Sequence, residues 1–216
     1  MTPRLILASL SPRRSDVLAQ LGLQHAVMPA DVDEAYLDGE TPAEHVERLA
    51  RNKASVISAR EPGALVVGGD TVVVDGARVL GKPEDGPAAV DMLVSLAGRS
   101  HTALSGVALA GPHGVVSGVA ETLVRFKAFS EYEARTYVET GEPLDKAGAY
   151  GIQGMGAALV EAIDGDYYAV MGFPIGAFVS VLLEAGWRYE YGSLTLVAEH
   201  EPVVEQAPGP VEPSDR

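Results

Sequence analysis

Apolar residues occur along this chain in two ways, as short continuous runs and as positions that recur every three or four residues. The continuous runs predict buried strands. They cover residues 4–8, 64–68, 71–74, 101–110, 115–127 and 157–163. Two junctions, Asp75–Gly76 and Pro112–Gly114, predict turns that join neighbouring strands into hairpins.

Helix signals stand between these strands. An N-cap residue followed by proline, a glycine–proline pair, or a capping box of the form Ser/Thr-x-x-Glu marks each helix start. Such signals lie at Ser11–Pro12, Thr41–Glu44, Gly86–Pro87 and Ser130–Glu133, and an apolar helix is predicted from Pro174 to Gly186. Because strands and helices alternate around a hairpin-rich middle, the pattern predicts an α/β fold with a mixed sheet.

The end of the chain has a different composition. From about Ala198 it is rich in Pro and Glu with little to bury, which predicts a disordered tail over 198–216 after an ordered region over 1–197. The net charge is −14 and the pI is near 4.7, and residues 199–216 contribute −4 of that charge. This acidity argues against a nucleic-acid polymer as partner, although a pocket of opposite local charge can still bind a small anion.

The 216 residues include no cysteine, which excludes disulfides and thiolate metal sites or nucleophiles. The N-terminal apolar run is too short for a secretory signal, and no apolar stretch approaches the roughly 20 residues of a membrane span. We therefore expect a soluble protein of the cytoplasm that does not bind membranes.

The first candidate site is the junction "SLSPRRSD" between the first predicted strand and helix. Free N–H groups and the helix dipole favour an anion there. Ser9 and Ser11 add hydroxyl donors, and Arg13 and Arg14 add planar guanidinium groups suited to phosphate or carboxylate oxygens. Because successive helical positions diverge, one arginine can face the pocket while the other faces solvent or a partner. A capped helix with two solvated cations fits the same residues.

A second candidate is Asp70 in "GGDTVVVDG", which follows an apolar run and two glycines. We expect Asp70 where the first of two strands opens out, a position suited to ligands and metals. An aspartate in an ordinary glycine-rich turn is the alternative. Lys82 in "LGKP" is expected across the Asp75–Gly76 hairpin from Asp70. A cation and an anion aimed at one point suit phosphoryl transfer.

Other charged residues carry weaker signals. Asp31, Asp33 and Glu34 in "DVDE" could hold Mg²⁺ through their oxygens, or could simply be solvated. Lys53 falls beside the apolar stripe of the helix that begins after Thr41, where a lysine either snorkels to solvent or reaches a ligand. By itself this position favours snorkelling. The five histidines have no metal-ligand spacing and are expected on the surface or in the core.

The glycine-rich segment "DKAGAYGIQG" contains one amide side chain, Gln153, between Ile152 and Gly154. An amide both accepts and donates, which matches the imide edge of uracil or thymine, where an N–H lies beside a carbonyl. Cytosine presents a different pattern at that edge. Gln153 is therefore a candidate for selecting the base by hydrogen bonding, and an ordinary flexible loop is the alternative.

Taken together, these segments resemble the Maf family of nucleoside triphosphate pyrophosphatases, also described as septum formation inhibitor-like. The matching stretches are "LASLSPRR", "DVDE", "RLARNKA", "VVGGDTVVV", "LGKP", "GRSHTALSGVAL", "DKAGAYGIQG" and "GFPI", in this order from about residue 5 to residue 176. The resemblance implies an elongated mixed sheet flanked by helices with a deep central cleft, similar to inosine triphosphatase. It also implies that residues 1–197 are a nucleotide pyrophosphatase domain, and that the protein is a homodimer.

The same resemblance implies roles for individual residues. Asp70 would be the proton acceptor that activates water, and Glu34 and Asp70 would hold a divalent metal, Mg²⁺ or Mn²⁺. Phosphate-binding positions of the family match Ser9, Arg13, Arg14, Lys53 and Lys82, beside which Ser11 offers its hydroxyl. The family reaction converts a nucleoside triphosphate to the monophosphate and pyrophosphate.

The branch of the family is indicated by Arg13, Thr71 and Gln153, which look like those of its dTTP/UTP-cleaving members. The expected function is thus hydrolysis of dTTP and UTP, and of modified pyrimidine nucleotides, in a house-cleaning role. Two alternatives remain at this point. One is a pyrophosphatase for 7-methyl-GTP or modified purines, and the other is a nucleotide-binding regulator of cell division without useful catalysis.

Overall fold

The computed structural model describes residues 3–197, which fold around one seven-stranded sheet. The order across the sheet is β2-β1-β3-β5-β6-β7, and β4 pairs with β3. Its strands are β1 (Leu5–Leu7), β2 (Ala26–Val27), β3 (Leu65–Asp75), β4 (Arg78–Leu80), β5 (Ser100–Gly111), β6 (Gly114–Phe126) and β7 (Val160–Asp164). Because β1 is parallel to β2 and β3 while the other pairs are antiparallel, the predicted mixed sheet is confirmed.

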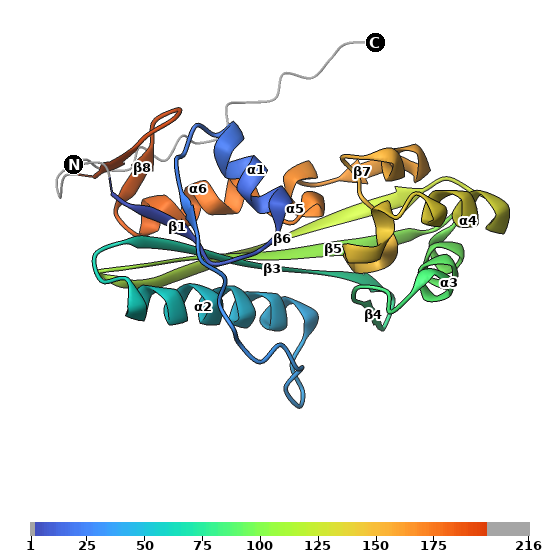
Figure 1. Cartoon of the computed structure of the whole chain (residues 1–216), viewed down its shortest axis with the longest axis horizontal. Helices are drawn as coiled ribbons and strands as arrows, with labels where there is room; N and C mark the ends of the chain where they lie inside the picture. The colour runs from blue at the N-terminus through green and yellow to red at the C-terminus, as the bar shows by residue number, and fades with distance from the viewer. Residues whose placement is uncertain (1–2, 198–216) are drawn as a thin grey trace, which may run out of the picture.

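Helices cover both faces of this elongated sheet, as Figure 1 shows. The long helix α2 lies along one face, and α1, α5 and α6 lie on the other, while α3 and α4 stand at one end. A small second sheet is formed by β8 (Trp187–Tyr189) and β9 (Leu194–Leu196). The helices are α1 (Pro12–Gln20), α2 (Pro42–Arg60), α3 (Gly86–Leu96), α4 (Glu131–Glu139), α5 (Tyr167–Met171) and α6 (Ile175–Glu184).

Local capping signals placed the helix starts correctly. The side chains of Thr41 and Ser130 each accept a hydrogen bond from the backbone N–H of the glutamate three residues later. That glutamate's carboxylate in turn accepts a hydrogen bond from the backbone N–H of the cap residue, so both predicted capping boxes are confirmed. Ser11 is the N-cap of α1 with Pro12 in the first turn, but its hydroxyl makes no capping hydrogen bond. That hydroxyl therefore remains available to a ligand.

The prediction of two separate strands at 64–68 and 71–74 was wrong. Both belong to the single strand β3, which pairs with β5 without interruption from Val66 to Val74. Gly68 in this strand and Gly106 in the neighbouring β5 allow a close approach of α2. A Cβ on Gly68 would lie 2.1 Å from the backbone oxygen of Ala50, and one on Gly106 would lie 2.4 Å from that of Val46, so α2 can rest directly on the sheet.

Other differences lie in the C-terminal third. The first residues of the predicted strand at 157–163 belong to a 3₁₀ helix, Met155–Leu159, and β7 begins only at Val160. Neither α5 nor the β8–β9 hairpin was predicted. The proposed tail over 198–216 lies outside the residues that the structure describes. Within residues 3–197, no helix is long and apolar enough to cross a membrane.

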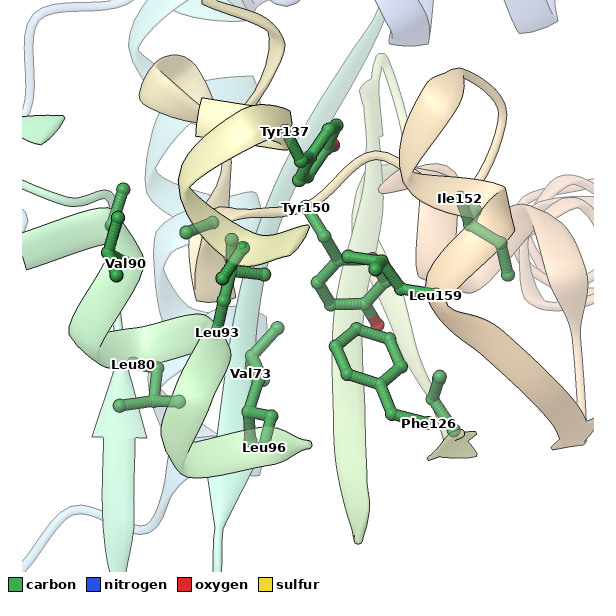
Figure 2. Packing of buried hydrophobic residues seen from close by; sticks show 14 of the residues in the cluster. Val73, Leu80, Val90, Leu93, Leu96, Phe126, Tyr137, Tyr150, Ile152 and Leu159 are labelled. Carbon is green, nitrogen blue, oxygen red and sulfur yellow. The ribbon is translucent and has the colours of Figure 1, made fainter. Parts of the chain in front are cut away.

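A distinct apolar cluster forms the end of the molecule at α3 and α4 and fixes the glycine-rich segment that contains Gln153. Figure 2 shows its members, among them Tyr150 next to Phe126, whose ring centroids are 4.8 Å apart in an edge-to-face arrangement. Tyr150 and Ile152 are buried in this cluster, whereas Gln153 is exposed. The chain thus changes from buried to exposed between Ile152 and Gln153, at the boundary of the cluster.

Candidate active site

The predicted site residues line one cleft of about 800 Å³. This confirms the cleft that the sequence resemblance implied, and it shows that segments far apart in the chain contribute to a single pocket. Ten of the residues singled out from the sequence line it, namely Ser9, Ser11, Arg13, Arg14, Glu34, Lys53, Asp70, Thr71, Lys82 and Gln153, whereas Asp31 and Asp33 do not.

The cleft begins at a notch in the edge of the sheet. On the side of β3 opposite β5, β1 pairs with residues 65–67 and β4 pairs with residues 73–75. Between them, no strand of the described chain pairs with residues 68–72 on this edge. The notch forms because β1 ends at Leu7 and the chain leaves the sheet to enter α1.

Asp70 lies in this notch, in the middle of β3, where it is paired with Gly106 of β5. The expectation that Asp70 marks the end of a strand was therefore wrong. The carboxylate is accessible because the neighbouring parallel strand ends, not because β3 does. The rule that ligands gather beyond the carboxyl ends of parallel strands still describes the site, with β1 as the strand that ends.

Lys53 is the centre of a charged cluster on the floor of the cleft. Its Nζ lies 2.8 Å from Oδ1 of Asp70 and 2.6 Å from Oε1 of Glu34. Only 7% of Lys53 is exposed, so the interpretation that this lysine snorkels to solvent was wrong. Its position on α2 turns it toward β3, where two carboxylates offset the cost of its burial.

The cations of the cleft lower the pKa of Glu34. Burial by itself would raise the pKa of Glu34, but the hydrogen bond and charge of Lys53, with weaker help from Lys82 and Arg14, lower it overall. The Glu34 carboxylate therefore stays ionised at a more acidic pH than an isolated glutamate. This keeps the negative charge of Glu34 beside the ammonium group of Lys53.

The donor set is compatible with a divalent cation. Glu34 and Asp70 come from different segments and both contact Nζ of Lys53, so their oxygens lie close together, and carboxylate oxygens are the ligands that Mg²⁺ and Mn²⁺ prefer. Mg²⁺ commonly uses one or two protein carboxylates and completes its shell with phosphates and water. A site built from three neighbouring acids in "DVDE" is not seen, since no group of three potential ligands comes together within residues 3–197.

Arg14 is bound mainly to the protein. Its Nε donates to the carbonyl of Gly172 at 2.9 Å, Nη1 donates to Oγ of Ser9 at 3.0 Å, and Nη2 donates to Oγ1 of Thr71 at 3.2 Å. Burial lowers the pKa of Arg14, and the charge of Asp70 opposes that shift. These bonds join the first loop, β3 and the end of α5 around the notch. Arg14 thus orders the Ser9 and Thr71 hydroxyls, which are themselves candidate substrate contacts.

Arg13 also faces the cleft, so neither arginine is turned away from it. Its Nη1 lies 3.1 Å from Oδ2 of Asp145, and Oδ1 of the same carboxylate lies 2.8 Å from Nζ of Lys146. Asp145 and Lys146 line the cleft but were not among the predicted site residues. Their adjacent charges within the glycine-rich segment were the available signal. Arg13 and Asp145 connect α1 with that segment across the opening.

Lys82 and Gln153 differ from the other polar residues of the cleft. Both side chains are exposed, and neither has a hydrogen bond or ion pair with another residue in the part of the chain described here. Lys82 follows β4 and Gln153 follows the 3₁₀ turns after α4, so they approach the cleft from separate segments. These two groups are free to bind a ligand without first breaking a protein contact.

A ring stack forms part of the wall and was not expected from the sequence. The rings of Tyr36 and His45 lie parallel with centroids 3.5 Å apart, and both residues line the cleft. His45 Nδ1 lies 3.0 Å from a carboxylate oxygen of Glu40, and Arg48 binds that carboxylate through two nitrogens. Arg48 also donates to the carbonyl of Ala35 at 2.9 Å.

This group fastens the long loop before α2. The hydrogen bond from Arg48 is the main reason that the pKa of Glu40 falls to about 2. The Glu40–Arg48 pair therefore persists across the neutral and mildly acidic range. Because Arg48 also binds Ala35, it restrains the backbone next to Glu34. No motif spacing marks such a contact, since it depends on how the loop folds back on α2.

Comparison with known proteins identifies the chain. The family of Maf-like proteins matches residues 4–185. The chain belongs to the Maf family. The proteins most similar to it include the dTTP/UTP pyrophosphatase of Symbiobacterium thermophilum, 50% identical over 184 residues that cover 85% of this chain and 95% of that protein. The dTTP/UTP pyrophosphatase of Myxococcus xanthus is 48% identical over 188 residues, covering 85% and 95%.

The resemblance of this Maf protein to its family is therefore confirmed at the level of the whole domain. Among solved structures, the Ham1 protein of Staphylococcus aureus aligns with 56% of this chain and 71% of that chain, at a TM-score of 0.38 and 16% identity. The fold assignment of the Maf protein rests on its own strand order and not on that alignment.

Proposed function

We propose that this Maf protein is a nucleoside triphosphate pyrophosphatase that hydrolyses dTTP and UTP to the monophosphate and pyrophosphate. The observation that carries the proposal is the Asp70–Lys53–Glu34 cluster on the floor of a cleft with five cationic side chains. Relatives about half identical over most of the chain bear the name dTTP/UTP pyrophosphatase, which supports this substrate choice.

The reaction needs a water molecule aligned with the α-phosphorus and opposite the pyrophosphate leaving group. Asp70 is the proposed base: it accepts the proton as the water oxygen bonds to phosphorus and the bond to the bridging oxygen breaks. Lys53, 2.8 Å from Asp70, keeps the carboxylate in place and adds positive charge near the phosphate. The products are the nucleoside monophosphate and pyrophosphate.

Groups at the rim of the cleft neutralise the charge of the other phosphates in this proposal. Arg13 and Lys82 are the proposed contacts for the outer phosphates, with the hydroxyls of Ser9 and Ser11 beside them. Arg14 is assigned a mainly indirect part, because three of its N–H groups are already bound to protein oxygens. A divalent metal, Mg²⁺ or Mn²⁺, held by Glu34 and Asp70, would supply further neutralisation of the triphosphate.

Base selection is assigned to Gln153, with Arg13 and Thr71 as the other residues that match the dTTP/UTP branch. The Gln153 amide can pair with the N–H and carbonyl of a uracil or thymine edge. Cytosine has an acceptor in place of that N–H, so an amide held in the orientation that suits uracil loses the hydrogen bond to it. A polar group that the bound base covers and leaves unpaired disfavours the wrong base more strongly than a lost apolar contact does.

The direct test is pyrophosphate release from dTTP, UTP, CTP and 7-methyl-GTP with Mg²⁺ or Mn²⁺. We expect turnover of dTTP and UTP and a loss of about 10²–10⁴-fold in Asp70→Asn, because the base is removed while the shape is kept. Asp91→Asn, an exposed carboxylate on α3, is the matched control and should retain activity. Full turnover by Asp70→Asn would refute the assignment of the base.

The two other candidate functions give different outcomes in the same assay. Faster release from 7-methyl-GTP than from UTP would indicate a purine enzyme. Nucleotide binding without pyrophosphate release would indicate a regulator. We further propose a cytoplasmic homodimer on the family resemblance alone, which fractionation and light scattering of the purified protein would test.

A further inference from the structure

The backbone that follows Gln153 is held by one carboxylate, that of Glu142. Its Oε2 accepts a hydrogen bond from the backbone N–H of Met155 at 2.9 Å, and its Oε1 accepts one from Gly156 at 3.1 Å. These bonds fix the chain on the C-terminal side of Gln153. Glu142 itself lies in the short 3₁₀ helix that follows α4.

The hydroxyl of Tyr137 fixes the chain on the other side. It donates to Oε1 of Glu142 at 2.8 Å and accepts from the backbone N–H of Gly151 at 3.0 Å. Tyr137 comes from α4 and lies in the apolar cluster of Figure 2, where only 7% of it is exposed. The two side chains together hold backbone groups two residues before and two residues after Gln153.

The glycines of this segment show how tightly it is held. A Cβ on Gly154 would lie 2.5 Å from Oε2 of Glu142, and one on Gly156 would lie 2.5 Å from the hydroxyl oxygen of Tyr137. A side chain at either position would push the Glu142 carboxylate or the Tyr137 hydroxyl away from its hydrogen bonds. The pair of Glu142 and Tyr137, here called the clamp, therefore depends on glycine at both positions.

The protonation states favour the same arrangement. Burial opposes ionisation of Glu142, but hydrogen bonds from Gly156, Met155 and Tyr137 lower its pKa overall. Burial raises the pKa of Tyr137. At neutral pH, a charged carboxylate thus accepts the three hydrogen bonds, and a neutral phenol is present to donate one of them.

We propose that Glu142 and Tyr137 are positioning residues for base selection, which hold residues 151–156 so that the Gln153 amide meets the base edge in one orientation. This inference rests on the proposed pyrophosphatase function and concerns the same cleft. Discrimination between bases by two hydrogen bonds requires the amide to be held within about half an ångström of its productive position. Since the Gln153 side chain is exposed and makes no hydrogen bond or ion pair with another described residue, the order available before the base binds is that of its backbone.

The test compares kcat/KM for UTP and CTP in the wild type, Glu142→Gln and Tyr137→Phe. Glutamine has one acceptor oxygen where the carboxylate has two, and phenylalanine removes the hydroxyl but keeps the ring. We expect the UTP-to-CTP ratio to fall about tenfold or more in each variant. Binding of inorganic tripolyphosphate, which has no base, should change little. Glu139→Gln removes the same charge from an exposed position on α4 and should keep the ratio.

The possible outcomes distinguish the positioning role of Glu142 and Tyr137 from the proposed pyrophosphatase function. A folded Glu142→Gln or Tyr137→Phe that loses UTP and CTP turnover equally, or keeps the wild-type ratio, would overturn the positioning role while the enzyme assignment stands. A wild type that releases pyrophosphate from no nucleotide would overturn the proposed function and this inference with it. If Glu142→Gln does not fold, the isosteric Tyr137→Phe decides.

Discussion

The charged side chains of the cleft divide into those already bound to the protein and those left open. Lys53 contacts two carboxylates, and Arg14 donates to three oxygens, so both act within the protein framework before any ligand arrives. Lys82 and Gln153 are exposed and without such partners among the described residues. Ligand affinity should therefore depend on the open groups, and catalytic geometry on the bound ones.

One buried residue predicts a pH dependence of stability. His101 is 2% exposed, and its Nδ1 is the one buried side-chain nitrogen or oxygen without a hydrogen-bond partner within residues 3–197. Nε2 lies 2.9 Å from the hydroxyl of Tyr150. Burial lowers the pKa of His101 to about 4, despite the opposing charge of Asp75. The native protein therefore holds this imidazole neutral.

In the unfolded chain the histidine has a pKa of about 6.5, so as the pH falls the unfolded chain binds the proton before the native protein does. The contribution of neutral His101 to the free energy of unfolding is therefore complete above pH 6.5. As the pH falls toward 4, the free energy of unfolding decreases by about 3 kcal/mol in total. Urea unfolding should show this loss in the wild type and in Tyr150→Phe, but not in the non-titrating variant His101→Gln. Equal slopes in wild type and His101→Gln between pH 4 and 7 would contradict the prediction.

At the scale of elements, the contact between α2 and β3 brings Lys53 to Asp70. The contact depends on Gly68, where an added Cβ would meet the Ala50 oxygen and, at 2.8 Å, the Ala54 nitrogen. Both obstacles belong to the backbone of a helix and cannot rotate away. A larger residue at this position must move α2, and Lys53 moves with it.

Gly68→Ala is therefore expected to lower the free energy of unfolding by about 1–3 kcal/mol and to reduce pyrophosphate release markedly. Thermal or urea unfolding and the nucleotide assay measure the two effects. Gly176→Ala in α6 is the matched control, because a Cβ there meets nothing within 4 Å. The control should be neutral or stabilising by up to about 1 kcal/mol. A fully stable and active Gly68→Ala would show that α2 does not need this close approach.

At the scale of the whole molecule, a protein of net charge −14 presents a cleft in which five cationic side chains face three carboxylates. The acidic surroundings repel anions at long range, and salt screens that repulsion beyond about 10 Å. Binding of a polyphosphate must therefore depend on short-range contacts inside the cleft. This is how an acidic protein can select a small anion and still avoid nucleic-acid polymers.

Inorganic tripolyphosphate tests this directly, since it has the triphosphate chain of the substrate without the nucleoside. At 100 times its Kd it should stabilise the protein by about 2.7 kcal/mol, seen as a rise of several degrees in Tm. Lys82→Ala should weaken this binding a few-fold, whereas Lys127→Ala, an exposed lysine that does not line the cleft, should leave it unchanged. No rise in Tm for the wild type would mean that the cleft does not bind phosphates.

The sequence by itself determined most of the elements and ten of the polar residues that line the cleft. Capping boxes at Thr41 and Ser130, the hairpin at Asp75–Gly76 and the apolar runs report local preferences, which act between residues a few positions apart. The motif segments likewise indicated the Maf family and ten of the residues that line the cleft, but not Asp145 or Lys146. Whether those residues act as proposed is a matter for the assays above.

Only the tertiary structure decided how those residues are arranged. The burial of Lys53 between two acids, the place of Asp70 in a mid-strand notch and the clamp of Glu142 on the Gln153 segment all join residues from separate elements. Local periodicity shows which face of an element is buried, but not which partner it is buried against. That choice depends on strand order and on where β1 ends, and these follow from the packing of the whole sheet.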